Sequence, residues 1–272
     1  TSLNYGLNWE QLGNIGSADL NDAIYHNNKF ILVGNSGSML SSDDAETWNQ
    51  LTLSENNLKG IAYGMGKLVI AGHNSTILTS NDDGINWTSQ QISINHDFGG
   101  IIFGNNKFLT FGGDSIFYSN DALNWTKVDK TFIDGIFNVR YLNGKFIVAA
   151  NNHIYRSSDG IMWEHINSPI GTQLIDVVYG NNIYVMSINH SGYLTSNDTL
   201  SWVDRKLPNP LTGWVSHAII FANNRFLIVG GSDNYSPYKA RYFHSNDGIT
   251  FTQGEDDLSS IKALYGLISN ID

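Results

Sequence analysis

The chain alternates between short apolar runs and short polar turns over nearly its whole length. Residues 58–91 show the unit most clearly: the runs 58–64, 67–72, 76–80 and 85–88 are separated by Gly, Asn, Asp, His and Ser. Runs of this length, rich in β-branched and aromatic residues and bounded by such turns, predict four antiparallel β-strands joined as a meander. We call them strands a to d. Helical spacing of apolar positions is absent from the sequence.

The second run of each unit, strand b, is the most apolar. It follows a two-residue turn of Asn-Asn or Asn-Gly in most units, and Asn and Gly tolerate the positive φ that such a hairpin requires. Strands that are apolar at nearly every position are typical of sheets covered on both faces. The b strands are predicted at 30–33, 67–72, 108–111, 146–149, 183–186 and 226–229.

An aromatic residue closes each unit at a nearly constant period. These residues are Trp9, Trp48, Trp87, Trp125, Trp163, Trp202 and Phe251, and their intervals by subtraction are 39, 39, 38, 38, 39 and 49. A fixed period near 40 residues indicates one supersecondary unit repeated and stacked. Radial repetition of four-stranded sheets is a β-propeller. We therefore predict an all-β chain that forms a single β-propeller domain over residues 1–272.

The repeat count predicts seven blades. Six complete units are flanked by two pieces of a seventh, whose inner strands would come from residues 261–272 and whose outer strand from residues 1–13. Pairing the two termini in one blade would remove two exposed sheet edges. This last blade is short and is expected to have three strands. Six blades is the alternative.

The turn between strands c and d carries a motif, seen in Ser157-Ser158-Asp159-Gly160-Ile161-Met162-Trp163. It resembles the Asp-box, or bacterial neuraminidase repeat, known from sialidases, from glycan-binding and adhesin propellers, and from receptor and assembly-factor propellers. The resemblance covers essentially the whole chain and implies the fold rather than an activity. The carboxylate can accept backbone N–H bonds across the turn, Gly allows positive φ, and Trp packs between blades. We assign this structural role to Asp43, Asp82, Asp121, Asp159, Asp198 and Asp247.

The chain departs from this pattern at several positions. Ala45, Ala122 and Thr199 stand where Gly160 stands, and Phe251 replaces Trp. A larger departure concerns the catalytic residues of sialidases. In that family three Arg side chains bind the substrate carboxylate, a Tyr–Glu pair serves as nucleophile and an Asp as acid/base. The sequence has five Arg, and Arg140 alone lies in a predicted a strand. The resemblance therefore implies a sialidase-like fold without the sialidase catalytic signature, and we assign no catalytic residue.

Charged residues in the a strands define a second candidate site. A buried Arg needs a carboxylate partner, and Asp176 on the next unit is the candidate partner for Arg140. One interpretation is a structural ion pair. The other is a central polar pocket formed by Asp22, Arg140, Asp176 and Lys262.

The b–c and d–a loops vary most between units, and variable loops on a repeated scaffold are where binding is expected. Their amides, interleaved with Trp, Tyr and His, suit sugar hydroxyls or a polar protein surface. The sixth unit is about ten residues longer than the others through its loop at 231–239. The predicted ligand-binding residues are His73, Asn74, Asn151, His153, His190, Trp214, His217, Asp233, Tyr235 and Tyr238.

The composition of the chain argues against several classes of partner and cofactor. A formal net charge of −10 argues against nucleic acid, which requires clustered Lys and Arg, and against an anionic membrane surface. The chain has no Cys, which excludes disulfides and thiolate metal sites, and no apolar run of about 20 residues. The His residues lack the spacing of metal ligands, so we expect no metal and no cofactor.

Together these features predict a non-catalytic binding propeller, lectin-like or adhesin-like, that recognises a glycan or a partner protein through the b–c and d–a loops. One alternative is a glycoside hydrolase that uses Asp22, Asp97 and Asp176 in a central funnel. The other is a structural subunit of a surface or virion assembly. The Cys-free, Asn-rich composition is compatible with a bacterial exported or virion protein, so we expect secretion or surface display. The sequence opens on Thr1, which fits either a removed leader or a trimmed initiator Met.

Overall fold

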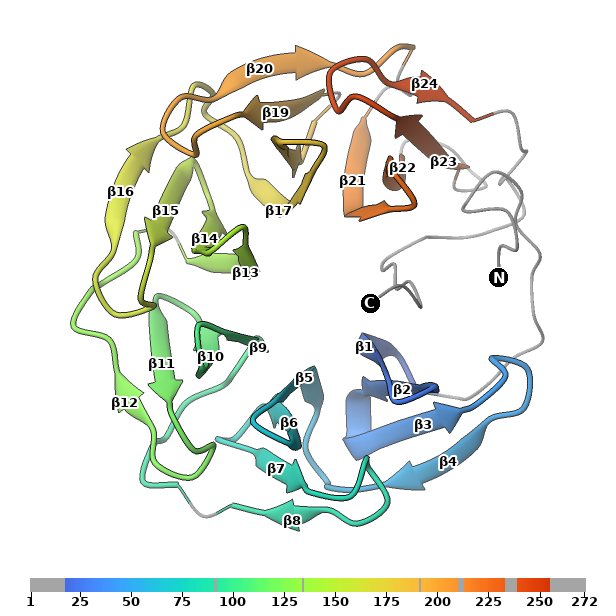
Figure 1. Cartoon of the computed structure of the whole chain (residues 1–272), viewed down its shortest axis with the longest axis vertical. Coiled ribbons are helices and arrows are strands. Elements are labelled where there is room, and N and C mark those ends of the chain that lie inside the picture. Colours follow the sequence, from blue (N-terminus) through green and yellow to red (C-terminus); the bar gives the residue numbers. More distant parts are fainter. Residues whose placement is uncertain are drawn as a thin grey trace. The chain divides into compact units, whose positions relative to one another are not determined.

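The computed structural model describes residues 18–90, 92–133, 135–190, 192–209, 213–232 and 239–254. Within them the chain forms six four-stranded sheets, and each sheet is a meander whose strands follow chain order (Figure 1). A short 3-10 turn at Asn35–Gly37 is the one helical segment in this part of the chain. Nothing in it is a helix long and apolar enough to cross a membrane.

The bounds of strands a to c follow the predicted runs closely. The run predicted for strand d at 85–88 overlaps β8 at Thr88 alone, because Ile85, Asn86 and Trp87 belong to the c–d turn. The first three sheets contain β1 (Leu20–His26), β2 (Lys29–Gly34), β3 (Ser38–Ser42), β4 (Asn49–Thr52), β5 (Leu58–Gly64), β6 (Lys67–Gly72), β7 (Ile77–Ser80), β8 (Thr88–Ser89), β9 (Gly100–Gly104), β10 (Lys107–Gly112), β11 (Ser115–Ser119) and β12 (Thr126–Lys127). The last three contain β13 (Ile136–Leu142), β14 (Lys145–Ala150), β15 (His153–Ser157), β16 (Glu164–Asn167), β17 (Leu174–Gly180), β18 (Ile183–Ile188), β19 (Gly192–Ser196), β20 (Val203–Lys206), β21 (Trp214–Ala222), β22 (Arg225–Ser232), β23 (Lys239–Ser245) and β24 (Thr252–Gln253).

The a–b turns have the predicted conformation. Both turn residues take positive φ in all six sheets, for example 48° and 59° at Asn27 and Asn28. Positive φ at both central residues defines the turn type whose twist matches that of an antiparallel hairpin. The recurring Asn and Gly therefore set the register of strands a and b.

The described chain divides into two compact units. Among the described residues, one comprises those within 18–146 and 157–164, and the other those within 147–156 and 165–254. We call them the N-terminal and C-terminal units; residues of the fourth sheet are divided between them.

Apolar clusters lie between neighbouring sheets within each unit. In the N-terminal unit, Ile31 of β2 and Leu58 of β5 belong to one cluster, and Ile77 of β7 and Phe108 of β10 to a second. In the C-terminal unit, residues of β18 and β22 are buried together with Trp214. The second sheet is thus covered on both faces, which explains the nearly continuous apolar pattern of its inner strands.

Glycine at the end of strand a lets neighbouring sheets approach closely. A Cβ at Gly180 would lie 2.4 Å from the Phe221 ring of the next sheet, and one at Gly104 would lie 2.2 Å from the Tyr141 ring. An aromatic side chain from one strand a therefore lies directly over the backbone of the preceding one.

The six sheets correspond to the six complete sequence units. The predicted pieces of a seventh blade, including the first aromatic at Trp9, lie outside the described residues.

Candidate functional site

The c–d turns, which we call Ser–Asp turns, are closed by one carboxylate and one hydroxyl. In the fourth sheet the Asp159 carboxylate accepts hydrogen bonds from Ser157 Oγ (2.9 Å) and from the N–H groups of Ile161 and Met162 (both 2.8 Å). Ser157 Oγ in turn accepts the N–H of Gly160 at 2.9 Å. The carboxylate at the equivalent position makes corresponding contacts in the second, third, fifth and sixth sheets. The structural role predicted for these carboxylates therefore fits their geometry.

In the first sheet the residue assigned to this role, Asp43, has to be corrected to Asp44. Asp44 accepts from Ser42 Oγ at 2.9 Å and from the N–H groups of Glu46 and Thr47 at 2.8 and 2.7 Å. The Asp43 carboxylate lies 3.8 Å from Lys29 Nζ and is largely exposed. The reason is the two-residue spacing from the serine, which places the second Asp of the pair over the turn.

Hydrogen bonding holds these carboxylates ionised. The backbone N–H of Thr47, then that of Glu46, lowers the pKa of Asp44 from its usual 3.8 to about 2. The backbone and side-chain N–H groups of Asn86 lower the pKa of Asp82 to about 2 as well. Burial acts to raise the pKa of Asp159, but its backbone donors outweigh it and the pKa is lowered. These groups serve the fold, so ligand binding has to be sought elsewhere.

The b–c and d–a loops lie at the opposite edge of each sheet from the Ser–Asp turns, because the strands are antiparallel; we call this edge the loop face. Between the first two sheets it carries an amide and lysine cluster. Asn21 Nδ2 donates to Asn35 Oδ1 (2.9 Å) and to the carbonyl of Leu58 (2.8 Å). Lys59 Nζ donates to Asn21 Oδ1 and Asn35 Oδ1 at 3.2 and 3.3 Å, and Asn35 Nδ2 donates to Asp19 at 3.3 Å. A cation is thus held among amide oxygens at the start of two neighbouring a strands.

The cluster continues between the second and third sheets. Asn74 Nδ2 donates to Asn56 Oδ1 (2.8 Å), and the backbone N–H of Asn74 donates to the Asp97 carboxylate (2.8 Å). Asn56 Nδ2 donates to Thr76 Oγ1 (2.9 Å). Asn74 and Asp97 are exposed. The loop-face network, as we call it, consists of Asp19, Asn21, Asn35, Asn56, Lys59, Asn74 and Asp97.

Of the residues predicted to bind a ligand, Asn74 belongs to this network and His73 is its half-exposed neighbour. In the C-terminal unit, His190 is exposed, Asn151 forms a backbone bridge with Gln173, and His217 is half-buried in β21. His153 Nδ1 lies 2.9 Å from His165 Nε2. Asp233, Tyr235 and Tyr238 lie outside the described residues.

The prediction that Trp214 binds a ligand on the loop face is wrong, because its side chain is buried. Its side chain is 2% exposed and packs edge-on against Phe243 with ring centroids 5.1 Å apart. Its Nε1 donates to Ser216 Oγ at 3.2 Å. The indole is part of the core between the fifth and sixth sheets, because the strand begins at Trp214 and its apolar face is covered there.

The carboxylates of Asp22 and Asp176 accept backbone hydrogen bonds where the pairing of strands a and b shifts register. The pairing of β1 with β2 shifts between Leu20 and Asp22, and there the Asp22 carboxylate accepts the N–H of Ala23 and the N–H of Ile61 from β5, both at 2.9 Å. Asp176 sits at the equivalent shift in β17, is 4% exposed and accepts the N–H of Val177 at 2.8 Å. Arg140 is half-buried in β13, and Lys262 lies outside the described residues. The structure thus gives Asp22 and Asp176 a backbone-bonding role, which the sequence pattern alone did not indicate.

Sequence analysis did not single out Asn21 and Lys59. The two stand at equivalent positions, since each is the residue at which the pairing of strands a and b shifts register. Other units have Phe137, Ile175 or His217 at this position. Aligning the units at that shift is the signal that could have found them.

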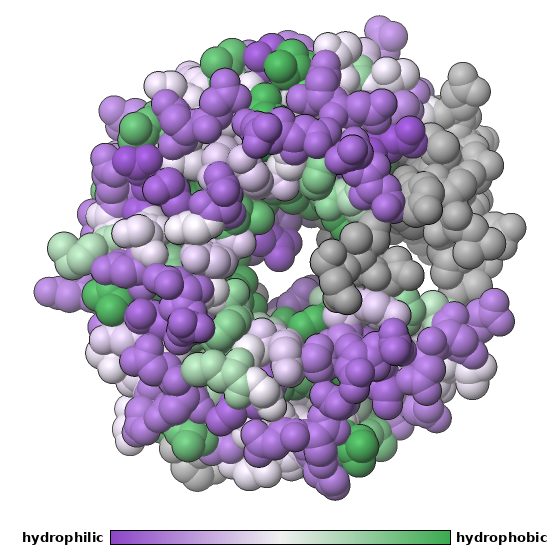
Figure 2. Space-filling view, in the orientation of Figure 1, coloured by the Kyte–Doolittle hydropathy of each residue, from purple (hydrophilic) through white to green (hydrophobic). Residues whose placement is uncertain are grey.

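Hydrophilic side chains dominate the face of the molecule shown in Figure 2. Over the described residues of that view, apolar side chains appear as separate small patches. A surface of this kind suits polar recognition rather than a broad apolar interface.

Comparison with known proteins identifies a fold and no family. The chain matches no family model and no curated protein. Among solved structures it is similar to YCF48 bound to a D1 peptide, with a TM-score of 0.76 and 19% identity over 96% of this chain and 88% of that one. It is also similar to YCF48 from Cyanidioschyzon merolae (TM-score 0.72, 16% identity, 91% and 88% covered). A GH74 enzyme of Niastella koreensis matches with a TM-score of 0.64 and 20% identity, over 88% of this chain and 38% of that one. With six meander sheets and these neighbours, the chain has the β-propeller fold.

Proposed function

We propose that this chain is a non-catalytic binding propeller that recognises a protein partner through the loop-face network. The observation that carries the proposal is the preorganisation of that network. Its amides and its lysine are already held by hydrogen bonds of 2.8 to 3.3 Å across the b–c and d–a loops of three neighbouring sheets. Groups fixed in this way lose little conformational freedom when a ligand binds.

The chemistry of the network suits a polypeptide segment. Amide side chains offer both donors and acceptors to a peptide backbone, and Lys59 offers a cation to a carboxylate in a protein whose net charge is −10. A solved structure of the same fold is YCF48 bound to a D1 peptide, and this likeness supports a peptide ligand. The Ser–Asp turn geometry further supports kinship with Asp-box propellers, which include receptor and assembly-factor members.

The glycoside hydrolase alternative is less well supported, although a GH74 enzyme shares the fold. Glycoside hydrolysis needs two carboxyl groups about 5–10 Å apart in one cleft, one of them free to donate a proton. The carboxylates considered for that role bond to backbone N–H groups: Asp22 to two of them, Asp97 to that of Asn74, and Asp176 to that of Val177. In each case the carboxylate oxygens are engaged in holding the backbone rather than directed to a substrate.

A lectin-like or adhesin-like function remains the alternative that the same amides could serve, since they can also bind sugar hydroxyls. We further propose secretion or surface display for this chain, as its composition suggests.

The test is a pair of screens on the purified protein, one against a displayed peptide library and one against a glycan array. We expect a peptide ligand whose affinity falls at least about tenfold in Lys59→Ala and in Asn74→Ala, since each removes a hydrogen bond to a charged or fixed partner. Lys127→Ala on β12 is the matched control, because Lys127 is equally a lysine but lies on an exposed outer strand.

Full affinity in both loop-face variants would place the ligand elsewhere. A glycan hit without a peptide hit would favour the lectin alternative. Circular dichroism and the urea midpoint of each variant separate loss of binding from loss of fold.

A further inference from the structure

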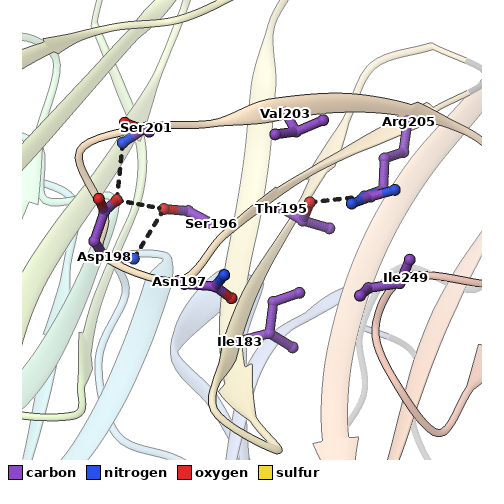
Figure 3. A pocket seen from close by; sticks show the side chains of 9 residues that line it. All are labelled: Ile183, Thr195, Ser196, Asn197, Asp198, Ser201, Val203, Arg205 and Ile249. Carbon is purple, nitrogen blue, oxygen red and sulfur yellow. Dashed lines mark hydrogen bonds between the residues drawn. The ribbon is translucent and has the colours of Figure 1, made fainter.

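A groove lies beside the Ser–Asp turn of the fifth sheet, formed by residues outside the loop-face network (Figure 3). Its volume is about 220 Å³. Its walls come from β18, β19, β20 and the turn between β19 and β20, and from the Ser–Asp turn of the sixth sheet through Ile249.

Arg205 of β20 provides a fixed cation in this groove. Its Nε–H donates to Thr195 Oγ1 on the paired strand β19 at 2.8 Å, which sets the plane of the guanidinium. The adjacent carboxylate, Asp204, pairs instead with Lys206 at 3.0 Å. Within the described part of the chain no hydrogen bond or ion pair engages the two Nη groups of Arg205. These groups form the planar fork that binds a carboxylate.

Three apolar side chains line the same groove as the guanidinium. Ile183 forms a buried part of the wall, while Val203 and Ile249 are 52% and 44% exposed. Figure 3 shows Val203 and Ile183 between the two ends of the groove and Ile249 beside Arg205. A ligand that covers Val203 and Ile249 removes apolar surface from water at the same time as it reaches the cation.

Asp198 lies at the opposite end of the groove from Arg205 in Figure 3. Its carboxylate already accepts hydrogen bonds from Ser196 Oγ, Leu200 N and Ser201 N. The N–H of Ser201, then that of Leu200, lowers the pKa of Asp198, so this end stays anionic. An anionic ligand group is therefore accepted at the Arg205 end and repelled at the other, which fixes the orientation of the ligand.

We propose that this groove binds a small branched aliphatic carboxylate, with the carboxylate on the Nη groups of Arg205 and the carbon chain against Val203, Ile183 and Ile249. The size agrees with this class, because sites for drug-sized ligands occupy about 300–1,000 Å³ and this groove is smaller. Free small acids and the last residue of a polypeptide share this chemistry. The site uses other residues than the proposed loop-face function and does not depend on it.

The test is a titration of the full-length protein, followed by amide chemical shifts, with N-acetyl-L-leucine as the probe. We expect saturable binding that shifts resonances of 195–205 and 249. N-acetyl-L-leucinamide, which lacks the charge, and acetate, which lacks the branched chain, are each expected to bind at least about tenfold more weakly. A tripeptide ending in leucine with a free carboxylate, compared with its amide, distinguishes a polypeptide terminus from a free acid as the preferred source.

Two variants test the assignment. Arg205→Gln should abolish the shifts, whereas Arg225→Gln, which changes the corresponding groove of the sixth sheet, should leave them unchanged. Val203→Asp adds a repelling carboxylate to the wall and keeps both Arg205 and Thr195, so it is the deciding variant if Arg205→Gln does not fold. Equal binding of acid and amide, or retained binding in both Arg205→Gln and Val203→Asp, would overturn the proposal.

Discussion

At the residue scale, the Ser–Asp turns depend on a single carboxylate each, and this dependence can be measured. Asp159→Ala removes the acceptor of three hydrogen bonds in a partly buried turn. We expect it to lower the free energy of unfolding by about 1.5–3 kcal/mol, the range for hydrogen bonds to a charged group. Asp43→Ala is the matched control and should change it little, since that carboxylate is largely exposed. Urea denaturation measures both, and equal losses would contradict the assignment of the turn carboxylates.

The same turns predict how stability depends on pH. The pKa of Asp44 and of Asp82 is about 2 in the folded chain, against a usual 3.8. Between these two pKa values the unfolded chain binds more protons than the folded chain, so the free energy of unfolding rises with pH in this range. The contribution of the two carboxylates to stability is fully present above about pH 4 and is lost as the pH falls toward 2. The urea midpoint should therefore fall steeply from pH 4 to pH 2. Asp82→Asn should flatten part of that slope, and an unchanged slope in this variant would count against these pKa values.

Single residues also show where sequence reasoning reached its limit. The motif indicated that a carboxylate closes each turn, yet in the first sheet two consecutive Asp fit it, and the spacing from Ser42 decided for Asp44. Trp214 is of a residue type that binding sites favour, but its side chain is buried. Whether a neighbouring sheet covers a side chain cannot be read from the local sequence pattern.

At the element scale, the close approach of neighbouring a strands should be sensitive to one added methyl group. In Gly180→Ala the new Cβ would meet three atoms of the Phe221 ring at 2.4 Å, closer than packed atoms approach. Forcing extra volume into a packed contact costs about 1–3 kcal/mol. Gly171→Ala in the same unit meets nothing within 4 Å and should be neutral or slightly stabilising. Thermal unfolding of the pair measures the difference, and comparable stability of the two variants would refute the contact.

The strands were the part of the fold that sequence could predict, because each is defined by its own residues. Alternating turns of Asn and Gly with apolar runs fixed the four-stranded units and their a–b hairpins. The loop-face network was harder, because its bonds join residues one unit apart, such as Asn21 with Asn35 and Lys59. The sequence pattern predicted the loops that hold this network and its residue Asn74, but it did not predict Lys59.

At the scale of the whole molecule, the proposed protein-binding network and the Ser–Asp turns lie at opposite edges of the sheets. The Ser–Asp turns close the hairpins at one edge, and the variable b–c and d–a loops hold the network at the other. The groove at Arg205, for which we propose a carboxylate ligand, lies at the turn edge. A repeated scaffold can carry separate sites because each unit is stabilised by its own neighbours.

The central claim is that a polypeptide partner binds at the loop face, and site-specific photo-cross-linking tests it most directly. A photoreactive residue is placed at Ser36 or Asp97, both exposed on the loop face, or at Asn124, exposed on a Ser–Asp turn. Each protein is irradiated with the tightest peptide from the library screen, and the adducts are measured by mass spectrometry. The account predicts adducts from positions 36 and 97 and none from position 124. Adducts from position 124 alone would contradict it.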